Sequence, residues 1–290
     1  VVVSHGSAGL FCYDFEGKKL WSRELGDSFH IWGTGSSPVI WKESVFLNFG
    51  PGARTFLIAV NKKDGKDLWK VEEAGGKEGK MGEDWIGSWS TPLISTINGR
   101  EELIQCWPGV VKAYDPEKGT FLWSCKGLEK DKARDRLIYT TPLVTSEVIV
   151  AMAGFGGPAI ALKPGEKGDV TDTNRLWRHP ANPQRIGSGV LIGDYIFMVN
   201  EPGTAQCIEW KTGKVIWNER LCGNVWGSFV YADGRLYATS LDGETAILAP
   251  EPKFEVIARN KLGERTLSSL AISDQRLYIR TYKHLWCIGK

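Results

Sequence analysis

The sequence predicts an all-β protein, a β-propeller built from four-stranded antiparallel blades. Three observations lead to this prediction. A hairpin unit of eleven residues recurs along the 290-residue chain, a pair of small residues precedes each copy after the first, and no segment shows the apolar period of an amphipathic helix. The interval between copies runs from 39 residues (Trp217 to Val256) to 54 residues (Trp69 to Trp123). Repeats of this length suit four strands each, whereas a solenoid has shorter repeats and a sandwich does not repeat one motif six times.

The stretch from Gly203 to Leu221 is the clearest copy of the hairpin unit. Its two halves, 205–209 and 215–219, alternate small or apolar residues with polar ones, as half-buried strands do. Gly213 between them offers the positive φ angle of a tight turn, and the carboxylate of Glu209 can accept hydrogen bonds from turn N–H groups. A lone hairpin leaves its apolar face in water, so it requires neighbouring sheets.

The copies share a small residue at the first position, an acid or amide at the third, a glycine in the turn and a tryptophan at the end. Three keep this spacing: 59–69 (AVNKKDGKDLW), 113–123 (AYDPEKGTFLW) and 207–217 (CIEWKTGKVIW). Copy 12–21 is one residue shorter, copy 161–177 contains the insertion KPGEKGDVTDTNR, and copy 246–256 ends in valine. An indole is large, flat and apolar with one donor, so we predict that the tryptophans wedge between adjacent sheets. They are Trp21, Trp69, Trp123, Trp177 and Trp217.

A second signature, two small residues followed by an apolar strand, lies upstream of the hairpins. It occurs at Ser36-Ser37, Ser90-Thr91, Thr140-Thr141, Gly187-Ser188, Gly227-Ser228 and Ser268-Ser269. In a propeller the innermost strands converge on the axis, where small side chains fit and large ones would collide. The strands that follow are predicted at 45–48, 102–107, 148–153, 195–200, 235–240 and 276–282.

The two ends of the chain supply incomplete blades. Residues 1–21 provide the last three strands of a first blade, and residues 267–287 provide the first three strands of a last one. With five complete blades between them, we predict seven blades in a single domain, residues 1–290, and the intact parent has room for an eighth. Because closure of a propeller ring commonly takes the missing strand from the N-terminus, we expect residues before Val1 to complete the ring.

Composition and charge exclude several classes of protein. The 36 basic and 34 acidic residues give a net charge of +2, without the basic excess of a nucleic-acid-binding protein. No apolar run reaches the roughly 18 residues of a membrane helix. The first residues have neither the basic start nor the cleavage pattern of a signal peptide. We expect a monomer with no membrane span and no nucleic-acid partner.

The six cysteines are predicted to be reduced and buried. In the repeat register Cys106 and Cys125 lie on the second and fourth strands of one sheet, roughly 9–10 Å apart and beyond the reach of a disulfide. Cys12, Cys207 and Cys287 occupy the small first position of the unit, which alanine fills elsewhere. We therefore predict small buried thiols rather than bridges or a metal site.

The eleven-residue unit resembles the tryptophan-docking motif of the pyrroloquinoline-quinone (PQQ) dehydrogenase-like propellers, and the likeness covers nearly the whole chain. Within that superfamily the chain is similar to the PQQ-like repeat proteins of bacteria, of the planctomycete type. Their relatives include the propeller lipoprotein of the outer-membrane barrel-assembly machine. The resemblance implies a periplasmic or extracellular location and, for most such proteins, no catalytic activity.

The resemblance does not extend to the cofactor site of the dehydrogenases. Those enzymes hold PQQ with a calcium ion, an aspartate base and a vicinal pair of cysteines. This sequence has no Cys-Cys pair, and no Glu, Asn and Asp ligand set maps onto the family's pattern. We therefore predict no cofactor and no metal, with PQQ and calcium as the alternative. The four histidines are scattered, and neither a nucleophile elbow nor a phosphate-binding loop occurs.

The candidate binding site is the mouth of the predicted central channel. It would be formed by loops that enter the first strand of each blade and by loops that join the second strand to the third. Aromatic rings beside arginine, asparagine and carboxylate groups suit a sugar or a peptide segment. The alternative is that these rings only plug the axis or pack between blades. The candidate residues are His30, Trp32, Trp85, Trp89, Tyr139, Arg185, Asn200, Glu201, Trp226, Asp242, Arg265 and Lys283.

The sequence thus predicts a non-catalytic, exported binding or scaffold module that recruits a protein or carbohydrate partner through the channel mouth or an exposed blade edge. Repeats without any catalytic constellation favour this interpretation. The alternative is an enzyme, either a PQQ-dependent dehydrogenase-like protein or a carbohydrate-active propeller that uses Glu201, Asp242 or Asp84.

Overall fold

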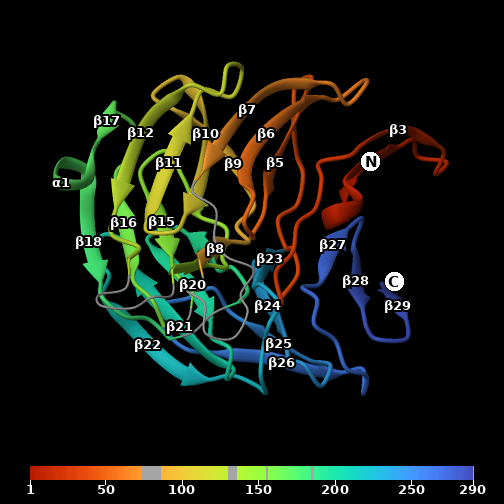
Figure 1. The fold of residues 1–290 in the computed structure, drawn as a ribbon. Coiled ribbons are helices and arrows are strands. Elements are labelled where there is room, and N and C mark those ends of the chain that lie inside the picture. Colours follow the sequence, from red (N-terminus) through yellow and green to blue (C-terminus); the bar gives the residue numbers. More distant parts are fainter. Residues whose placement is uncertain (74–85, 130–135, 155, 184–185, 290) are drawn as a thin grey trace. The chain divides into compact units, whose positions relative to one another are not determined.

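The computed structural model describes residues 1–73, 86–129, 136–154, 156–183 and 186–289 (Figure 1). The chain divides into two compact units, each of which is a series of antiparallel sheets. The first unit contains Val1–Ala153 and Gly157–Ala181, and the second contains Gly154–Gly156 and Asn182–Lys290. The prediction of a single domain over residues 1–290 stays a prediction.

Among its described residues, the first unit holds four successive sheets of the repeat and a separate two-stranded sheet of β8 (Ile86–Ser88) and β13 (Arg136–Ile138). The first has three strands, β1 (Val2–Ser4), β2 (Leu10–Tyr13) and β3 (Lys19–Arg23), with the short 3₁₀ helix η1 (Gly6–Ala8) between β1 and β2. The second has β4 (Val39–Trp41), β5 (Ser44–Phe49), β6 (Thr55–Asn61) and β7 (Asp67–Glu73). The third is built from β9 (Leu93–Ile97), β10 (Arg100–Trp107), β11 (Val110–Tyr114), β12 (Phe121–Lys126) and β17 (Gly168–Asp169). The fourth has β14 (Leu143–Val144), β15 (Ile149–Met152), β16 (Ala159–Leu162) and β18 (Arg175–His179).

The second unit holds three further sheets. The first has β19 (Val190–Ile192), β20 (Tyr195–Val199), β21 (Thr204–Glu209) and β22 (Val215–Arg220). The next has β23 (Val230–Ala232), β24 (Arg235–Thr239), β25 (Glu244–Leu248) and β26 (Val256–Lys261). The last has three strands, β27 (Ala271–Ser273), β28 (Arg276–Arg280) and β29 (Leu285–Ile288). The predicted all-β propeller, with five complete blades and two partial ones, is confirmed.

The repeat unit has the same strand register in all five blades that carry its tryptophan. The small first residue lies directly opposite the indole: Cys12 faces Trp21, Ala59 faces Trp69, Ala113 faces Trp123, Ala161 faces Trp177 and Cys207 faces Trp217. The register shifts immediately after the small residue in each of these pairs. A small side chain opposite the ring leaves the indole free to turn outward from its own sheet, where it can meet a neighbouring one.

The polar third position of the unit caps the turn, as predicted. The Oδ1 atom of Asp14 accepts hydrogen bonds from the backbone N–H of Glu16 and Lys18, and that of Asp115 does the same for Glu117 and Lys118. These bonds satisfy N–H groups that a two-stranded turn leaves without strand partners.

The hydrophobic core lies between successive sheets of each unit. One cluster joins Val111 and Trp123 of the third sheet to Ile149 and Ile160 of the fourth. Another joins the first and second sheets of the second unit through residues such as Phe197 and Leu236. The second sheet of the first unit is buried on both faces: Val45 and Leu47 pack against the first sheet, and Phe46 and Leu57 pack against the third. This explains why β5 and β6 are apolar almost throughout rather than alternating.

The insertion in the fourth blade forms a strap, defined as residues 163–174, over the edge of the third blade. Its strand β17 pairs in parallel with β12, so that Gly168 lies opposite Trp123 and Asp169 opposite Ser124. The strap ends in the four-residue helix α1 (Thr171–Asn174). The side chain of Asn174 closes its base by donating hydrogen bonds to backbone carbonyl groups of the strap. An edge strand that would otherwise be open is thereby covered over two residues.

The strap is anchored by one apolar side chain and by polar contacts. Val170 is 2% exposed and belongs to the core shared by the third and fourth sheets. Asp169 forms an ion pair of 2.9 Å with Lys126 and accepts hydrogen bonds from Thr171. The hydrogen bonds from the Thr171 hydroxyl and the Lys126 ammonium lower the pKa of Asp169 to about 2. Both partners of the ion pair are about half exposed, so the pair adds little stability and Val170 is the main anchor.

We expect Val170→Asp to release the strap from the third blade. An unpaired carboxylate in this core costs several kcal/mol, so trypsin should cleave after Lys167 at least about tenfold faster than in the wild-type protein. Thr173→Asp places the same side chain at an exposed position of the strap and is the control. The assignment of Val170 as anchor is wrong if the two variants are cleaved at the same rate.

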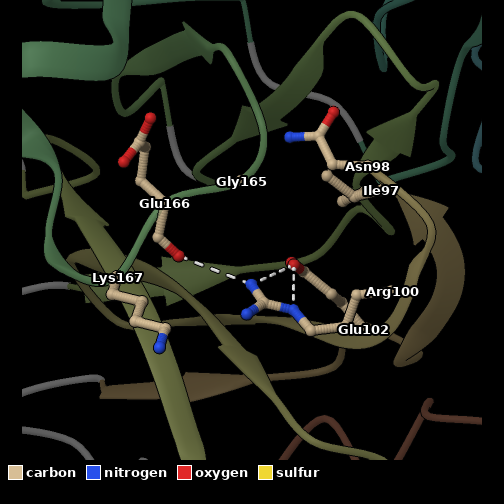
Figure 2. A pocket seen from close by; sticks show the side chains of 7 residues that line it. All are labelled: Ile97, Asn98, Arg100, Glu102, Gly165, Glu166 and Lys167. Atoms are coloured by element: carbon tan, nitrogen blue, oxygen red, sulfur yellow. Dashed lines mark hydrogen bonds and ion pairs between the residues drawn. The ribbon is translucent and has the colours of Figure 1, made fainter.

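A pocket of about 390 Å³ lies between the strap and the hairpin of β9 and β10 (Figure 2). Its floor contains the carboxylate of Glu102, which is fully buried. One oxygen of Glu102 accepts hydrogen bonds from Nε and Nη2 of Arg100, and the other accepts one of 2.6 Å from the indole of Trp123. Trp123 therefore donates its N–H to a residue of its own sheet, and the strap pairs with the strand that carries it.

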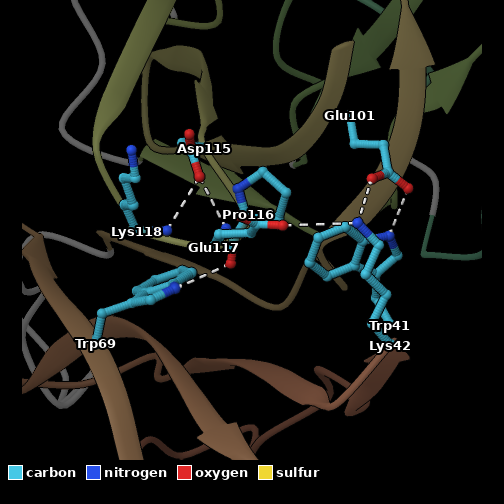
Figure 3. A network of polar contacts seen from close by, with 8 residues as sticks. All are labelled: Trp41, Lys42, Trp69, Glu101, Asp115, Pro116, Glu117 and Lys118. Carbon is cyan, nitrogen blue, oxygen red and sulfur yellow. Dashed lines mark hydrogen bonds and ion pairs between the residues drawn. The ribbon is translucent and has the colours of Figure 1, made fainter. Parts of the chain in front are cut away.

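Trp21 and Trp69 instead dock on the following blade. The indole N–H of Trp69 donates to the backbone oxygen of Pro116 at 3.0 Å, in the turn between β11 and β12 (Figure 3). Trp21 bonds in the same way to Lys62, in the turn between β6 and β7, at 2.9 Å. In Figure 3 a second indole, that of Trp41, donates to Glu101 across the same seam at 2.8 Å. These bonds tie each of the first two blades to the next one.

The turn glycines leave room for the docked rings. A Cβ atom at Gly65 would lie 2.7 Å from the ring of Trp21, and one at Gly119 would lie 2.6 Å from the ring of Trp69. Both glycines also have positive φ angles, +72° and +68°. In the second unit, Trp217 donates to the backbone oxygen of Glu251 at 3.2 Å and packs edge-on against Phe254. Trp177 is partly buried beside His179, with ring centroids 4.7 Å apart.

The cysteines are all free, and five of the six are buried. Cys106 and Cys125 both lie opposite Val111, on either side of β11, as the repeat register predicted. Burial raises the pKa of Cys106 to about 12, so its thiol stays protonated. The prediction of burial is wrong for Cys287, which is exposed because it lies on β29, the outer strand of a three-stranded sheet.

Candidate functional site

Four of the predicted site residues form an aromatic cluster in the first unit, which consists of His30, Trp32, Trp89 and Tyr139. The ring of His30 lies 4.8 Å from that of Trp89 at 88° and 5.3 Å from that of Trp32. Tyr139 lies edge-on to both tryptophans, with centroids 5.5 Å from Trp89 and 6.4 Å from Trp32. Edge-to-face contacts at these distances are favourable, so the rings support one another.

Three loops bring these rings together. Trp89 follows strand β8 (Ile86–Ser88) and Tyr139 follows β13 (Arg136–Ile138), and these strands pair in parallel outside the repeat pattern. The backbone N–H of Trp89 donates to Ile138, and its indole N–H donates to Gly33 at 2.9 Å. A Cβ atom at Gly35 would lie 3.1 Å from the Trp89 ring, which shows how closely the third loop passes. The cluster is thus fixed by backbone as well as by ring contacts.

His30 is the buried polar member of the cluster. It is 5% exposed, and its Nδ1 atom accepts a hydrogen bond of 3.2 Å from the backbone N–H of Trp32. Since Nδ1 acts as an acceptor, the proton of the neutral ring resides on Nε2, and this buried atom has no hydrogen-bond partner among the described residues. Burial lowers the pKa of His30 below its ordinary value of 6.5, so the ring is neutral at pH 7.

The lowered pKa of His30 predicts a loss of stability in mild acid. Below pH 6.5 the unfolded chain binds a proton at this ring more readily than the folded chain does, so the free energy of unfolding falls as the pH falls. We expect chemical denaturation to show a larger drop between pH 7.5 and pH 5.5 for the wild-type protein than for His30→Gln. Equal drops in the two proteins would contradict this account of the cluster.

The loop that carries His30 also presents apolar side chains to solvent. Phe29 is 55% exposed, Ile31 is 50% exposed and Trp32 is 42% exposed. Three large apolar residues within four positions, next to a rigid group of rings, form an exposed patch of the kind that marks an interaction surface. The sequence analysis missed Phe29 and Ile31, although they flank the predicted residue His30, and the run of large apolar side chains in FHIW was a signal that could have identified them.

The second unit places most of its predicted site residues on a belt of connected turns, defined by residues 200–203, 224–226, 240–243, 264–267 and 281–284. Backbone hydrogen bonds link each turn to the next: Val225 N–H to Glu201, Leu241 N–H to Asn224, Thr266 N–H to Leu241 and Tyr282 N–H to Arg265. Loops entering the first strand and loops joining the second strand to the third therefore do share one surface within this unit.

The polar groups of the belt are largely engaged with one another. The indole of Trp226 donates to Glu201 at 2.9 Å, and the side-chain oxygen of Asn200 accepts from the N–H of Thr204. The hydroxyl of Ser240 donates to Asp242 and lowers its pKa, and Lys261 lies 3.4 Å from the same carboxylate. In these contacts among the described residues, neither Glu201 nor Asp242 faces a second carboxylate.

Arg265 and Lys283 lie at the far end of the belt. The guanidinium of Arg265 stacks over the ring of Tyr282 at 5.6 Å, and the backbone N–H of Lys283 donates to Glu264. Glu264 also contacts His284 at 2.8 Å, and that contact lowers the pKa of the carboxylate. Trp85, Arg185 and Asp84 lie outside the described residues.

Two general features of the described residues bear on chemistry. No three histidine, cysteine, aspartate or glutamate side chains among them are placed to hold a metal ion. Within the same part of the chain, no helix has the length and apolar character needed to cross a bilayer.

Comparison with known proteins gave one family and a structural neighbour. The family model described as outer membrane protein assembly factor BamB matches residues 1–219. The crystal structure of BamB from Moraxella catarrhalis is similar in fold, with a TM-score of 0.72 and 17% sequence identity over 97% of this chain and 78% of that chain. No curated protein matches the sequence. The match agrees with the predicted relationship to PQQ-like repeat propellers.

Proposed function

Because the chain belongs to the family of the outer membrane protein assembly factor BamB, we propose that it is a non-catalytic scaffold that binds another protein in the bacterial cell envelope. The observation that carries the proposal is the aromatic cluster, which combines a rigid set of rings with the exposed side chains of Phe29, Ile31 and Trp32. The location that fits this family is the periplasm, and the proposed protein needs neither a cofactor nor a metal.

The chemistry of the patch favours a protein segment over a sugar. Aromatic and aliphatic side chains are exposed together, and the indole N–H of Trp89 already donates to Gly33. A sugar site offers hydrogen-bonding groups around its rings, whereas a patch of exposed Phe, Ile and Trp fits apolar side chains of an extended peptide. A hot spot for such a partner would centre on Trp32, since tryptophan dominates the energetics of many interfaces.

A crosslinking experiment tests the proposed function. We would place the photoreactive residue p-benzoylphenylalanine at Trp32 in cells of the source organism. The control carries it at Phe15, which is 95% exposed in the turn between β2 and β3. We expect a discrete adduct with a cell-envelope protein at position 32 and none at position 15. The proposal fails if neither position gives an adduct or if both give the same adducts.

A second measurement addresses catalysis directly. The purified protein would be incubated with PQQ and calcium, and its absorption and dye-linked alcohol oxidation would be recorded. The proposed scaffold shows neither a bound quinone spectrum nor turnover. Oxidation that depends on PQQ would replace the scaffold proposal with the enzymatic alternative.

A further inference from the structure

The pocket beneath the strap lies apart from the aromatic cluster and is rich in hydrogen-bond donors. It is lined by Ile97, Asn98, Arg100, Glu102, Gly165, Glu166 and Lys167. Both carboxylate oxygens of Glu102 are already engaged, one by Arg100 and the other by Trp123. The backbone oxygen of Glu166 accepts a hydrogen bond from Arg100. In the described contacts, the buried carboxylate of Glu102 is therefore fully engaged, whereas Nη1 of Arg100 and the ammonium group of Lys167 are not.

Arg100 is held in place by the buried carboxylate. Its Nε and Nη2 atoms contact one oxygen of Glu102, so the plane of the guanidinium group is fixed from one edge. Figure 2 shows its remaining nitrogen, Nη1, directed to the side on which the ammonium group of Lys167 lies. None of the described contacts occupies Nη1. A guanidinium group fixed along one edge offers the other as a preorganised donor.

The strap contributes the second charge. Lys167 extends from the strap into the side of the pocket opposite Glu102, while the carboxylate of Glu166 is turned away from Arg100 (Figure 2). Glu166 has a positive φ of +81°, and its backbone oxygen, rather than its carboxylate, accepts the hydrogen bond from Arg100. The pocket thus presents two cationic groups, those of Arg100 and Lys167. The carboxylate of Glu102 is already engaged in hydrogen bonds, and that of Glu166 is directed away from Arg100.

We propose that this pocket binds a small molecule through a carboxylate or phosphate group, which would bridge Arg100 on the third blade and Lys167 on the strap. An anion supplies the acceptors that the unoccupied donors require, and a volume of about 390 Å³ falls within the range of about 300–1,000 Å³ common for small-molecule sites. Because the ligand joins the strap to the blade, its binding would also hold the strap closed.

Calorimetric titration at constant ionic strength tests the proposal with inorganic phosphate and citrate as probes and glucose as the neutral control. We expect saturable binding of at least one anion, with a dissociation constant on the order of 1 mM or lower, and none of glucose. Phosphate binding alone would identify a phosphate site, and citrate binding alone a carboxylate site. The same anion should also slow cleavage after Glu166 by a protease specific for glutamate. Trypsin is not used here, because the lysine variants remove its cleavage sites in the strap.

Matched variants separate a built site from general charge attraction. Lys167→Gln should weaken the anion at least about tenfold, because a hydrogen bond to a charged group is lost. Lys163→Gln removes the same charge from an exposed position of the strap outside the pocket and should change the affinity less than about twofold. Arg100→Lys retains a cation for Glu102 but removes Nη1, and should also weaken binding. The proposal is overturned if neither anion saturates or if the two lysine variants behave alike.

Discussion

Gly119→Ala is expected to lower the free energy of unfolding by roughly 2–5 kcal/mol. Holding a non-glycine residue at a φ of +68° costs about 1–2 kcal/mol. The new methyl group would also lie 2.6 Å from the ring of Trp69, and displacing a packed side chain costs about 1–3 kcal/mol more. Gly65→Ala should have an effect of the same size, because its methyl group meets Trp21 at 2.7 Å. Urea denaturation followed by circular dichroism measures both changes.

Gly17 provides the matched control for these two variants. It occupies the same position of the repeat unit and has a φ of +83°, yet no atom lies within 4 Å of the place where its Cβ would be. Gly17→Ala should therefore cost only the backbone strain of about 1–2 kcal/mol. If all three alanine variants are destabilised equally, the rings are not packed against the turns as described.

Trp123→Ala should destabilise the protein by about 3–5 kcal/mol, the range for truncating a large buried aromatic residue. Trp123 is fully buried between the third and fourth sheets, and its N–H is one of the groups that satisfy the buried carboxylate of Glu102. Trp123→Phe keeps most of the ring but leaves that carboxylate oxygen without its donor, at a cost of about 1–3 kcal/mol. The midpoint of urea denaturation should therefore fall in the order wild type, Phe variant, Ala variant.

Phe121 on the same strand supplies the control for Trp123. Its side chain is 51% exposed, so Phe121→Ala should change stability by only about 0.5 kcal/mol. A Trp123→Ala variant that unfolds at the same urea concentration as Phe121→Ala would show that the indole does not fill the space between the sheets.

The repeats made most of the fold predictable. Because each copy carries a small residue, a capped turn and a tryptophan at fixed spacing, the hairpins, the number of blades and the incomplete first and last sheets could be derived from the sequence. The same register placed Cys106 and Cys125 on either side of one strand. Cys287 was predicted incorrectly because its burial depends on a neighbouring strand rather than on its own position in the unit.

Features outside the repeat were not predictable in the same way. The strap has a polar sequence without strand periodicity. Its parallel pairing with β12 joins residues more than 40 positions apart, so this pairing cannot be predicted from a local sequence pattern. The parallel pair of β8 and β13 has the same character. The pocket beneath the strap depends on this pairing, which is why neither Arg100 nor Lys167 appeared among the predicted site residues.

The candidate site was predictable in kind and only partly in detail. Large aromatic residues before the small-residue signature pointed to His30, Trp32, Trp89 and Tyr139, and the structure brings these four together. The predicted site residues of the second unit lie on one belt because backbone hydrogen bonds join its turns. Such bonds do not depend on residue type and so could not be predicted from the sequence. Side-chain contacts such as that of Trp226 with Glu201 arise from this backbone arrangement.

A double-mutant cycle between Trp69 and Gly119 tests the central structural claim, that the repeated tryptophans hold successive blades together. These residues lie on different sheets, and the claim requires that their contributions to stability depend on one another. In the Trp69→Ala background the added methyl group has space, so Gly119→Ala should cost only about 1–2 kcal/mol, as at Gly17. The cycle should then give a coupling energy of about 1–3 kcal/mol. Additive effects of the two substitutions would contradict the claim.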